Sequence, residues 1–270
     1  MLFRSSEFVL SLFEQIMQDD LKAQHRSIID RCVQAVYRPY IASGYKGNAP
    51  TLTDLQAEIK KQPEPEAQEL ALAAELFISG SLSIFAQKTN VDQNNRLTSY
   101  NILDLGEQLL PMGMLVILES IYNRVIQNWR SGRRTWVFVD EFSIFFRYPF
   151  ATNFFLRMWK QVRKRAGYMT GITQNVGEML TSKDACWMLA NSEFLIMLSQ
   201  SASDRAALAE LLNISDTQLS YVENADPGCG LMKFGGAFIP FVNSFPEDTE
   251  LYKLMTTKPA DREQVKPNGV

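Results

Sequence analysis

The stretch TWVFVDEF, residues 135–142, is an apolar run that leads directly into two acids, and the fold prediction depends on it. A strand that is buried on both faces of a parallel sheet needs a continuous apolar run of this kind. Ligands of open parallel sheets bind beyond the carboxyl ends of the strands, which is where Asp140 and Glu141 stand. The stretch therefore predicts either a buried strand that delivers two carboxylates to a ligand site, or a core strand that simply ends in polar residues.

Apolar runs alternate with helical patterns around this stretch, as is typical of a parallel sheet with helical crossovers. A long helix should have Pro111 in its first turn and stop at Gly132, and a hairpin should turn at Gly235 and Gly236. The expected strands are residues 96–105, 136–141, 168–173 and 193–199, with a helix over 152–167. The pattern predicts an α/β core with a mostly parallel sheet.

The first 80 residues carry helical patterns only, with apolar residues in pairs four apart. One helix should open at Thr53, where Gln56 completes a capping box, and stop at Pro63. His25 lies among polar positions and is expected at the surface. Together the patterns predict three parts: an all-helical subdomain over residues 1–90, a core over 91–250, and a C-terminal helix with a mobile tail over 251–270.

Composition narrows the class of protein. With 27 basic and 30 acidic residues the net charge is -3, so any contact with nucleic acid or an acidic membrane must be a local patch. Three cysteines without CxxC spacing and a single histidine argue against zinc and for a reducing compartment. No membrane span is expected, because the most apolar run, residues 113–122, is interrupted by Glu119.

A second group of candidate residues follows one strand later, in RKRAGYMTGITQN, residues 163–175. If the two strands are neighbours, Gln174 lies beside Asp140 and Glu141, where its amide can bond both an attacking water and a phosphate oxygen. The alternative is that Gln174 is an ordinary polar strand terminus. The basic cluster that contains Arg163 and Lys164 can equally be a solvated face, since cations are favoured at a helix C-terminus.

Together the two motifs resemble the HerA and FtsK branch of the P-loop ATPases, in which an acidic pair is followed by Arg-Lys, a glycine, and a strand ending in Thr-Gln. More of the chain looks like the C-terminal ATPase domain of VirB-type conjugative type IV secretion ATPases, of the kind found in Gram-positive integrative conjugative elements. The segments that carry this resemblance are residues 6–17, 27–40, 80–106 and 213–257. The resemblance implies a partial RecA-like P-loop NTPase core.

The resemblance also implies an activity and a setting. Proteins of this family hydrolyse ATP with Mg2+ as ring oligomers at the cytoplasmic, inner face of the cell membrane, where they energise conjugative DNA transfer. The implied partners are other copies of the chain and inner-membrane channel components of the secretion system, with the coupling protein and the DNA relaxosome as further candidates.

Individual residues receive roles from the same resemblance. Asp140 would hold magnesium through water, Glu141 would be the catalytic base, and Gln174 would sense the third phosphate. Arg163, together with Lys164, would act toward a nucleotide of its own or of the neighbouring subunit, because a cation on the transferring phosphoryl group stabilises the transition state. Arg205 is the second arginine candidate for the nucleotide.

One element of the family pattern has no match. No segment of the chain fits the phosphate loop GxxxxGK[ST]; GYKGNAP, residues 44–50, lacks its second glycine and its GK pair. The chain therefore looks like the C-terminal part of a longer ATPase, either a truncated reading frame or an excerpt, and we expect it to be inactive on its own. The alternatives are a DNA-pumping coupling-protein motor and a non-catalytic, degenerate ATPase module that docks onto other secretion subunits.

Overall fold

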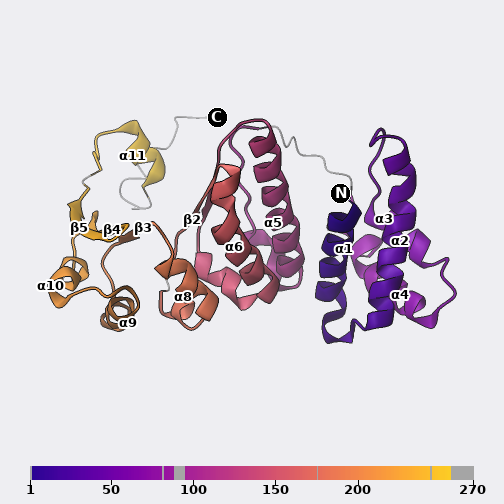
Figure 1. Cartoon of the computed structure of the whole chain (residues 1–270), viewed down its shortest axis with the longest axis horizontal. Helices are drawn as coiled ribbons and strands as arrows, with labels where there is room; N and C mark the ends of the chain where they lie inside the picture. The colour runs from indigo at the N-terminus through magenta and orange to yellow at the C-terminus, as the bar shows by residue number, and fades with distance from the viewer. Residues whose placement is uncertain (1, 81, 88–94, 175, 244, 257–270) are drawn as a thin grey trace, which may run out of the picture. The chain divides into compact units, whose positions relative to one another are not determined.

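A computed structural model describes residues 2–80, 82–87, 95–174, 176–243 and 245–256 (Figure 1). The chain forms two compact units. Unit 1 comprises residues 1–137 and 148–170, and unit 2 comprises residues 138–147 and 171–270. The predicted boundary at residue 90 and the predicted tail from residue 257 lie outside the described residues.

Every element described before residue 87 is helical. In chain order these are α1 (Leu2–Met17), η1 (Gln18–Asp20), α2 (Ala23–Ala42), α3 (Leu52–Ile59), α4 (Pro65–Ile78) and η2 (Ser83–Ala86). The helices α1, α2, α3 and α4 share one apolar cluster, because each contributes an apolar stripe to it. Its centre includes Phe13, Ile29, Ile59 and Leu70, all exposed by 1% or less.

His25 lies in this core with none of its surface exposed, so the expectation of a surface residue was wrong. Its Nδ1 accepts the backbone N–H of Lys22 at 3.1 Å, which closes a capping box at the start of α2. Its Nε2 lies 3.1 Å from Oε2 of Glu69 on α4. Burial is tolerated because both ring nitrogens have partners.

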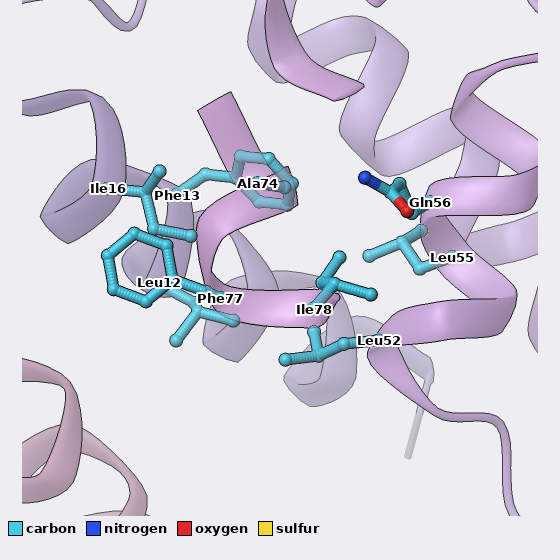
Figure 2. A pocket seen from close by; sticks show the side chains of 9 residues that line it. All are labelled: Leu12, Phe13, Ile16, Leu52, Leu55, Gln56, Ala74, Phe77 and Ile78. Carbon is cyan, nitrogen blue, oxygen red and sulfur yellow. The ribbon is translucent and has the colours of Figure 1, made fainter. Parts of the chain in front are cut away.

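The capping box of α3 is formed by Thr51 and Asp54, not by Thr53 and Gln56 as predicted. Gln56 instead lies inside the helical core, where its Nε2 donates to the carbonyl oxygen of Ala71 at 2.9 Å. Figure 2 shows Gln56 as the polar member of an otherwise apolar lining around a cavity of about 10 Å³. Such a volume is about that of a single water probe, so the helices are closely packed.

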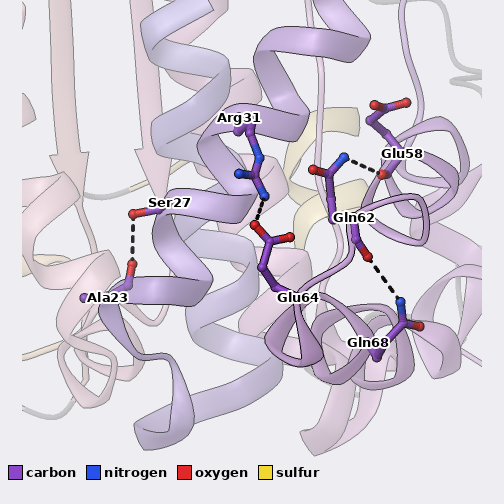
Figure 3. A network of polar contacts seen from close by, with 7 residues as sticks. All are labelled: Ala23, Ser27, Arg31, Glu58, Gln62, Glu64 and Gln68. Atoms are coloured by element: carbon purple, nitrogen blue, oxygen red, sulfur yellow. Dashed lines mark hydrogen bonds and ion pairs between the residues drawn. The ribbon is translucent and has the colours of Figure 1, made fainter.

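A polar network ties α2 to the start of α4 (Figure 3). Nη2 of Arg31 donates to Oε1 of Glu64 at 2.6 Å, and Gln62, in the same connection, donates to the carbonyl oxygen of Glu58. The Arg31 hydrogen bond lowers the pKa of the Glu64 carboxyl, and the same bond raises the pKa of the guanidinium. The ion pair therefore favours the folded state only while Glu64 is charged.

The change Glu64→Gln should destabilise the chain in a pH-dependent way. A carboxyl whose folded pKa is depressed adds stability above its unfolded pKa, about 4.3, and loses it as the pH falls through the folded value. The difference in Tm between the wild type and Glu64→Gln should therefore be present at pH 7 and shrink toward pH 4. Thermal unfolding followed by circular dichroism at both pH values checks this, with the exposed change Glu75→Gln, also on α4, as the control. An equal difference at both pH values would show that the charge of Glu64 is not involved.

The prediction of a strand over residues 96–105 was wrong. The described chain has no regular element there until η3 (Leu103–Leu105), and Leu97 is 89% exposed. Alternating apolar residues form a strand only where a neighbour accepts their hydrogen bonds, and no described strand pairs with this segment. The helix that follows, α5 (Gly106–Arg130), starts upstream of Pro111 and ends just before Gly132, whose φ of 71° suits a C-terminal glycine.

Helix α5 is the one helix among the described residues that is long and apolar enough to cross a membrane by length and composition. A single such helix is weak evidence for a span. In unit 1, α5 packs against α6 (Pro149–Gln161), and its Met112, Met114, Leu118 and Val125 are buried (Figure 1).

Strands β1 (Thr135–Val139) and β2 (Gly167–Gly171) form a parallel pair. Thr135 N–H donates to Ala166 O, and Ile172 N–H donates to Val139 O, so residue numbers rise together along both strands. Val137 and Val139 are buried on one face. On the other face Trp136 is 55% and Phe138 is 68% exposed, which corrects the prediction of burial on both faces.

Unit 2 contains a separate antiparallel sheet in the order β3 (Phe194–Met197), β4 (Cys229–Phe234) and β5 (Ala237–Val242). The predicted hairpin is confirmed, because Phe234 pairs with Ala237 across the turn at Gly235, which has a φ of 56°. The α/β class is confirmed, but β3 was expected in the parallel sheet and pairs antiparallel with β4. The helices described in this unit are η4 (Phe142–Arg147), α7 (Val176–Leu180), α8 (Lys183–Ala190), α9 (Ala202–Leu212), α10 (Asp216–Leu219), η6 (Ser220–Val222) and α11 (Glu250–Met255).

Candidate functional site

The acidic pair lies in a turn at the carboxyl end of β1. Ile172 N–H donates to Val139 O at 2.8 Å, and Phe142 N–H donates to Ile172 O at 2.8 Å. Both backbone hydrogen bonds are made with Ile172. Asp140 and Glu141 therefore form a short loop between the two residues, Val139 and Phe142, that bond to it. The two carboxylates are thus presented beyond the strand end, where a parallel sheet binds ligands.

Glu141 has a left-handed backbone conformation, with a φ of 47°. The Oδ1 atom of Asp140 accepts the Glu141 N–H at 3.0 Å, which helps to hold this turn. A non-glycine residue in this region costs on the order of 1 kcal/mol, and such conformations cluster at functional sites. Asp140 is exposed and Glu141 is half-buried, so both carboxylates are within reach of a ligand.

Two residues that position this turn were missed in the sequence. Phe142, 2% exposed, packs its ring against Gly171 at the end of β2. A Cβ on Gly171 would lie 2.5 Å from the Phe142 ring, so only glycine allows this approach. The glycine in YMTGIT was the available signal, because an isolated glycine in a strand pattern often marks a close contact.

Helix η4 (Phe142–Arg147) continues from the acidic turn and is tied to α7 by an ion pair that the sequence did not reveal. Nε of Arg147 donates to Oε1 of Glu178 at 2.7 Å. The hydrogen bond from Arg147 lowers the pKa of the Glu178 carboxyl. The pair is mostly solvent-exposed, so we assign it a positioning role, with little contribution to stability.

Gln174 follows Ile172 closely, at the same carboxyl edge of the parallel pair as Asp140 and Glu141. Its side chain is exposed. The structure therefore brings the predicted acids and the predicted amide to one edge within unit 2.

Arg163 and Lys164 come just before β2 in the chain. Both are exposed in η5 (Val162–Arg165), which precedes β2, whereas Gln174 follows β2. They belong to unit 1, and the acids belong to unit 2. In chain order, therefore, these two cations come before β2, whereas the acids and Gln174 come after β1 and β2, respectively.

Arg205 already has a carboxylate partner. It lies in α9, where its Nη2 pairs with Oε1 of Glu223 at 2.8 Å, and 19% of its side chain is exposed. To contact a nucleotide it would have to leave Glu223. The ion pair with Glu223 gives Arg205 a structural role, which is the alternative to contact with a nucleotide.

No group of three His, Cys, Asp or Glu side chains gathers as a metal site within the described part of the chain. Magnesium does not need such a group, because it is commonly held by one or two carboxylates together with phosphate oxygens and waters. The exposed Asp140 fits that mode, since only one of its oxygens is engaged by Glu141 N–H. The cysteines are free, and burial raises the pKa of the Cys32 thiol to about 11.

A wide groove of about 540 Å³ lies among the helices of unit 1, between α1, α2 and the connection that leads to α3. Its lining includes Phe8, Tyr37, Tyr40 and Phe85. None of the predicted site residues lines this groove or the small cavity of Figure 2. The acidic turn therefore contributes no lining residue to either hollow.

Comparison with known proteins shows the fold. No family model and no curated protein sequence matches the chain. Among solved structures, VirB4 of Thermoanaerobacter pseudethanolicus is similar with a TM-score of 0.73 and 21% identity, over 90% of this chain and 70% of that one. The bacterial conjugative coupling protein TrwBdeltaN70 is similar with a TM-score of 0.50 and 12% identity, over 92% of this chain and 71% of that one. The α/β architecture that carries the acidic turn is therefore that of VirB4 and, more distantly, of TrwB.

Proposed function

We propose that this chain is the C-terminal portion of an ATPase that energises conjugative DNA transfer through a type IV secretion system. One observation carries the proposal: Asp140, Glu141 and Gln174 lie at one edge of a parallel strand pair, in a chain with the fold of VirB4. The motif resemblance to the conjugative ATPases supports the same conclusion independently of the fold.

The roles proposed for the residues at this edge are those that the family resemblance implies. Glu141, held in a fixed turn, orients a water and takes its proton; Gln174 bonds that water and a phosphate oxygen. Asp140 would hold magnesium through water beside the phosphates of ATP. The metal, when bound, neutralises charge that develops on the transferring phosphoryl group.

Arg163 and Lys164 suit a nucleotide on a neighbouring copy better than one at their own acidic turn. They precede β2, while the acids and Gln174 stand where the strands end. A ring of copies would supply such a cation from the next subunit, as we propose for Arg163 with Lys164. Arg205 remains the second candidate, on the condition that it leaves Glu223.

The wider setting is part of the proposal. The three parts are the helical subdomain over 1–90, the incomplete RecA-like core over 91–250 and the C-terminal helix and tail over 251–270. We place the chain in the cytoplasm against the inner face of the membrane, with channel components as partners and the coupling protein and relaxosome as further ones. Because the phosphate loop has no match in this chain, it must be supplied by another segment or polypeptide for ATP to turn over.

Transfer of the mobile element in cells tests the function. Donor cells in which the chain carries Glu141→Gln should transfer at strongly reduced frequency, because the proposed base is lost while the shape of the side chain is kept. The exposed change Glu210→Gln in α9 is the matched control and should leave transfer unchanged. Normal transfer with Glu141→Gln would favour the non-catalytic docking module instead, and salt-dependent loading onto duplex DNA would favour a coupling-protein motor.

A further inference from the structure

Basic residues are concentrated in two segments that contain no carboxylate. Residues 120–139 include Arg124, Arg130, Arg133 and Arg134, and residues 142–177 include Arg147, Arg157, Lys160, Arg163, Lys164 and Arg165. Neither segment contains an aspartate or a glutamate, although the whole chain has a net charge of -3. A local positive surface can therefore exist on a chain that is acidic overall.

Backbone hydrogen bonds within unit 1 bring the two segments together. Thr135 N–H donates to Ala166 O at 3.1 Å, which places the connection before β1 beside the one before β2. Arg133 N–H donates to Asn128 O at 2.8 Å and so folds the first connection back onto the end of α5. We call the exposed cations that gather here the basic edge. They are Arg130, Arg133, Arg134, Arg163 and Lys164.

The charges of the basic edge are not neutralised within the described residues, since none of the five makes an ion pair there. Two further arginines add to the local charge. The guanidinium carbons of Arg157 and Arg165 lie 5.2 and 5.5 Å from the centre of the Tyr122 ring on α5. Stacking on an aromatic ring holds an arginine in place without consuming its charge.

Trp129 adds an aromatic surface to the basic edge. It is 47% exposed and immediately precedes Arg130 at the end of α5. We propose that the basic edge binds single-stranded nucleic acid, with its arginines on the phosphates and Trp129 stacked on a base. Unpaired bases stack on exposed aromatic rings, and guanidinium groups bond phosphates in a bidentate manner.

Other anionic partners fit this surface less well. A membrane is the nearest alternative, because the exposed aromatic residues Trp136 and Tyr168 follow the basic edge and interfacial attachment uses such side chains. Their rings are stacked on each other with centroids 5.0 Å apart, which gives a flat aromatic face of the kind on which unpaired bases stack. A duplex keeps its bases stacked within the helix and would leave Trp129 without a role. The proposal concerns a surface of unit 1 and does not depend on ATP hydrolysis. Arg163 and Lys164 serve it in copies where they do not contact a neighbouring nucleotide, and the variants tested below leave both residues unchanged.

Fluorescence anisotropy of a labelled 20-nucleotide DNA strand, with RNA of the same sequence in parallel, tests the proposal on the full chain. We expect binding that weakens steeply with salt, and Arg133→Glu/Arg134→Glu should reduce affinity roughly tenfold or more and lower the salt slope by about 1.4. Trp129→Ala should weaken binding by roughly 5- to 100-fold, as expected for the loss of one stacked base.

The matched control is Lys46→Glu/Lys60→Glu, two exposed lysines in the helical part of unit 1, which changes the net charge equally and should leave binding intact. Circular dichroism verifies that each variant is folded. Three results would overturn the proposal: no binding by the wild type at 50 mM salt, equal loss in the control variant, or binding to phosphatidylserine vesicles without binding to the strand. Duplex DNA that binds more tightly than the single strand, with an affinity that Trp129→Ala does not change, would also overturn it.

Discussion

ATP turnover should appear only when a phosphate loop is supplied to this chain, and Glu141→Gln should then remove it. We expect the chain alone to hydrolyse no ATP above background, because the amides and lysine of the loop provide most contacts to the phosphates. Fusion of a strand, GxxxxGK[ST] loop and helix from a conjugative ATPase ahead of the chain should restore turnover. In the fusion, loss of the proposed base should lower kcat by roughly 10² to 10⁴-fold.

The reason for expecting an effect of this size is the geometry around Glu141. The ladder bonds to Ile172 and the contact of Phe142 with Gly171 fix the turn, so Glu141→Gln changes the acid–base group without moving it. A fluorescent ATP analogue should still bind the variant, which separates lost chemistry from lost folding. Glu210→Gln in the same fusion serves as the control. Turnover by the chain alone, or a fusion that keeps its rate after Glu141→Gln, would contradict the assignment.

Leu70→Ala should destabilise the chain by about 2–5 kcal/mol, whereas Leu72→Ala should change little. Both leucines lie on α4, but Leu70 is fully buried in the helical core and Leu72 is 71% exposed. Truncation of a buried leucine loses its burial and leaves a cavity, and neither penalty applies to an exposed leucine. Denaturant unfolding followed by circular dichroism measures both.

This comparison also tests whether the first 80 residues have a core of their own. The two changes have the same effect on helix propensity, so the difference between them reports packing alone. A small effect of Leu70→Ala, similar to that of Leu72→Ala, would mean that α1–α4 do not depend on the cluster around Ile29, Ile59 and Leu70.

Features set by local sequence were predicted well. The run that ends in Asp140 becomes β1, and the glycine pair at 235 and 236 forms the expected turn. Each depends on a few neighbouring residues, because apolar patterning and positive φ angles are local properties. The placement of Asp140, Glu141 and Gln174 at one edge follows from the strands being neighbours, which the order of elements suggested.

Features set by distant contacts were not predictable. His25 can be buried because Glu69, 44 positions away in the sequence, is the hydrogen-bond partner of its second ring nitrogen, Nε2. The segment containing Leu97 has a strand-like pattern but finds no described partner. Thr51 and Thr53 both precede a suitable N3 residue; Thr51 is the N-cap of the helix, and Gln56 bonds the carbonyl oxygen of Ala71, a distant contact that the local pattern does not reveal.

The exposed side chains of β1 and β3 affect how long the chain persists in a cell. Trp136 and Phe138 on β1 and Phe194 and Ile196 on β3 are all at least half exposed, and within the described residues β2 and β3 each pair with a single neighbour. Exposed strands of this kind can pair wrongly with other chains, and they make a protein a target of chaperones and proteases. A copy whose exposed strands become covered by another protein would persist, and an uncovered copy would be cleared. The amount of this chain in a cell would then depend on such assembly as well as on the expression of its gene.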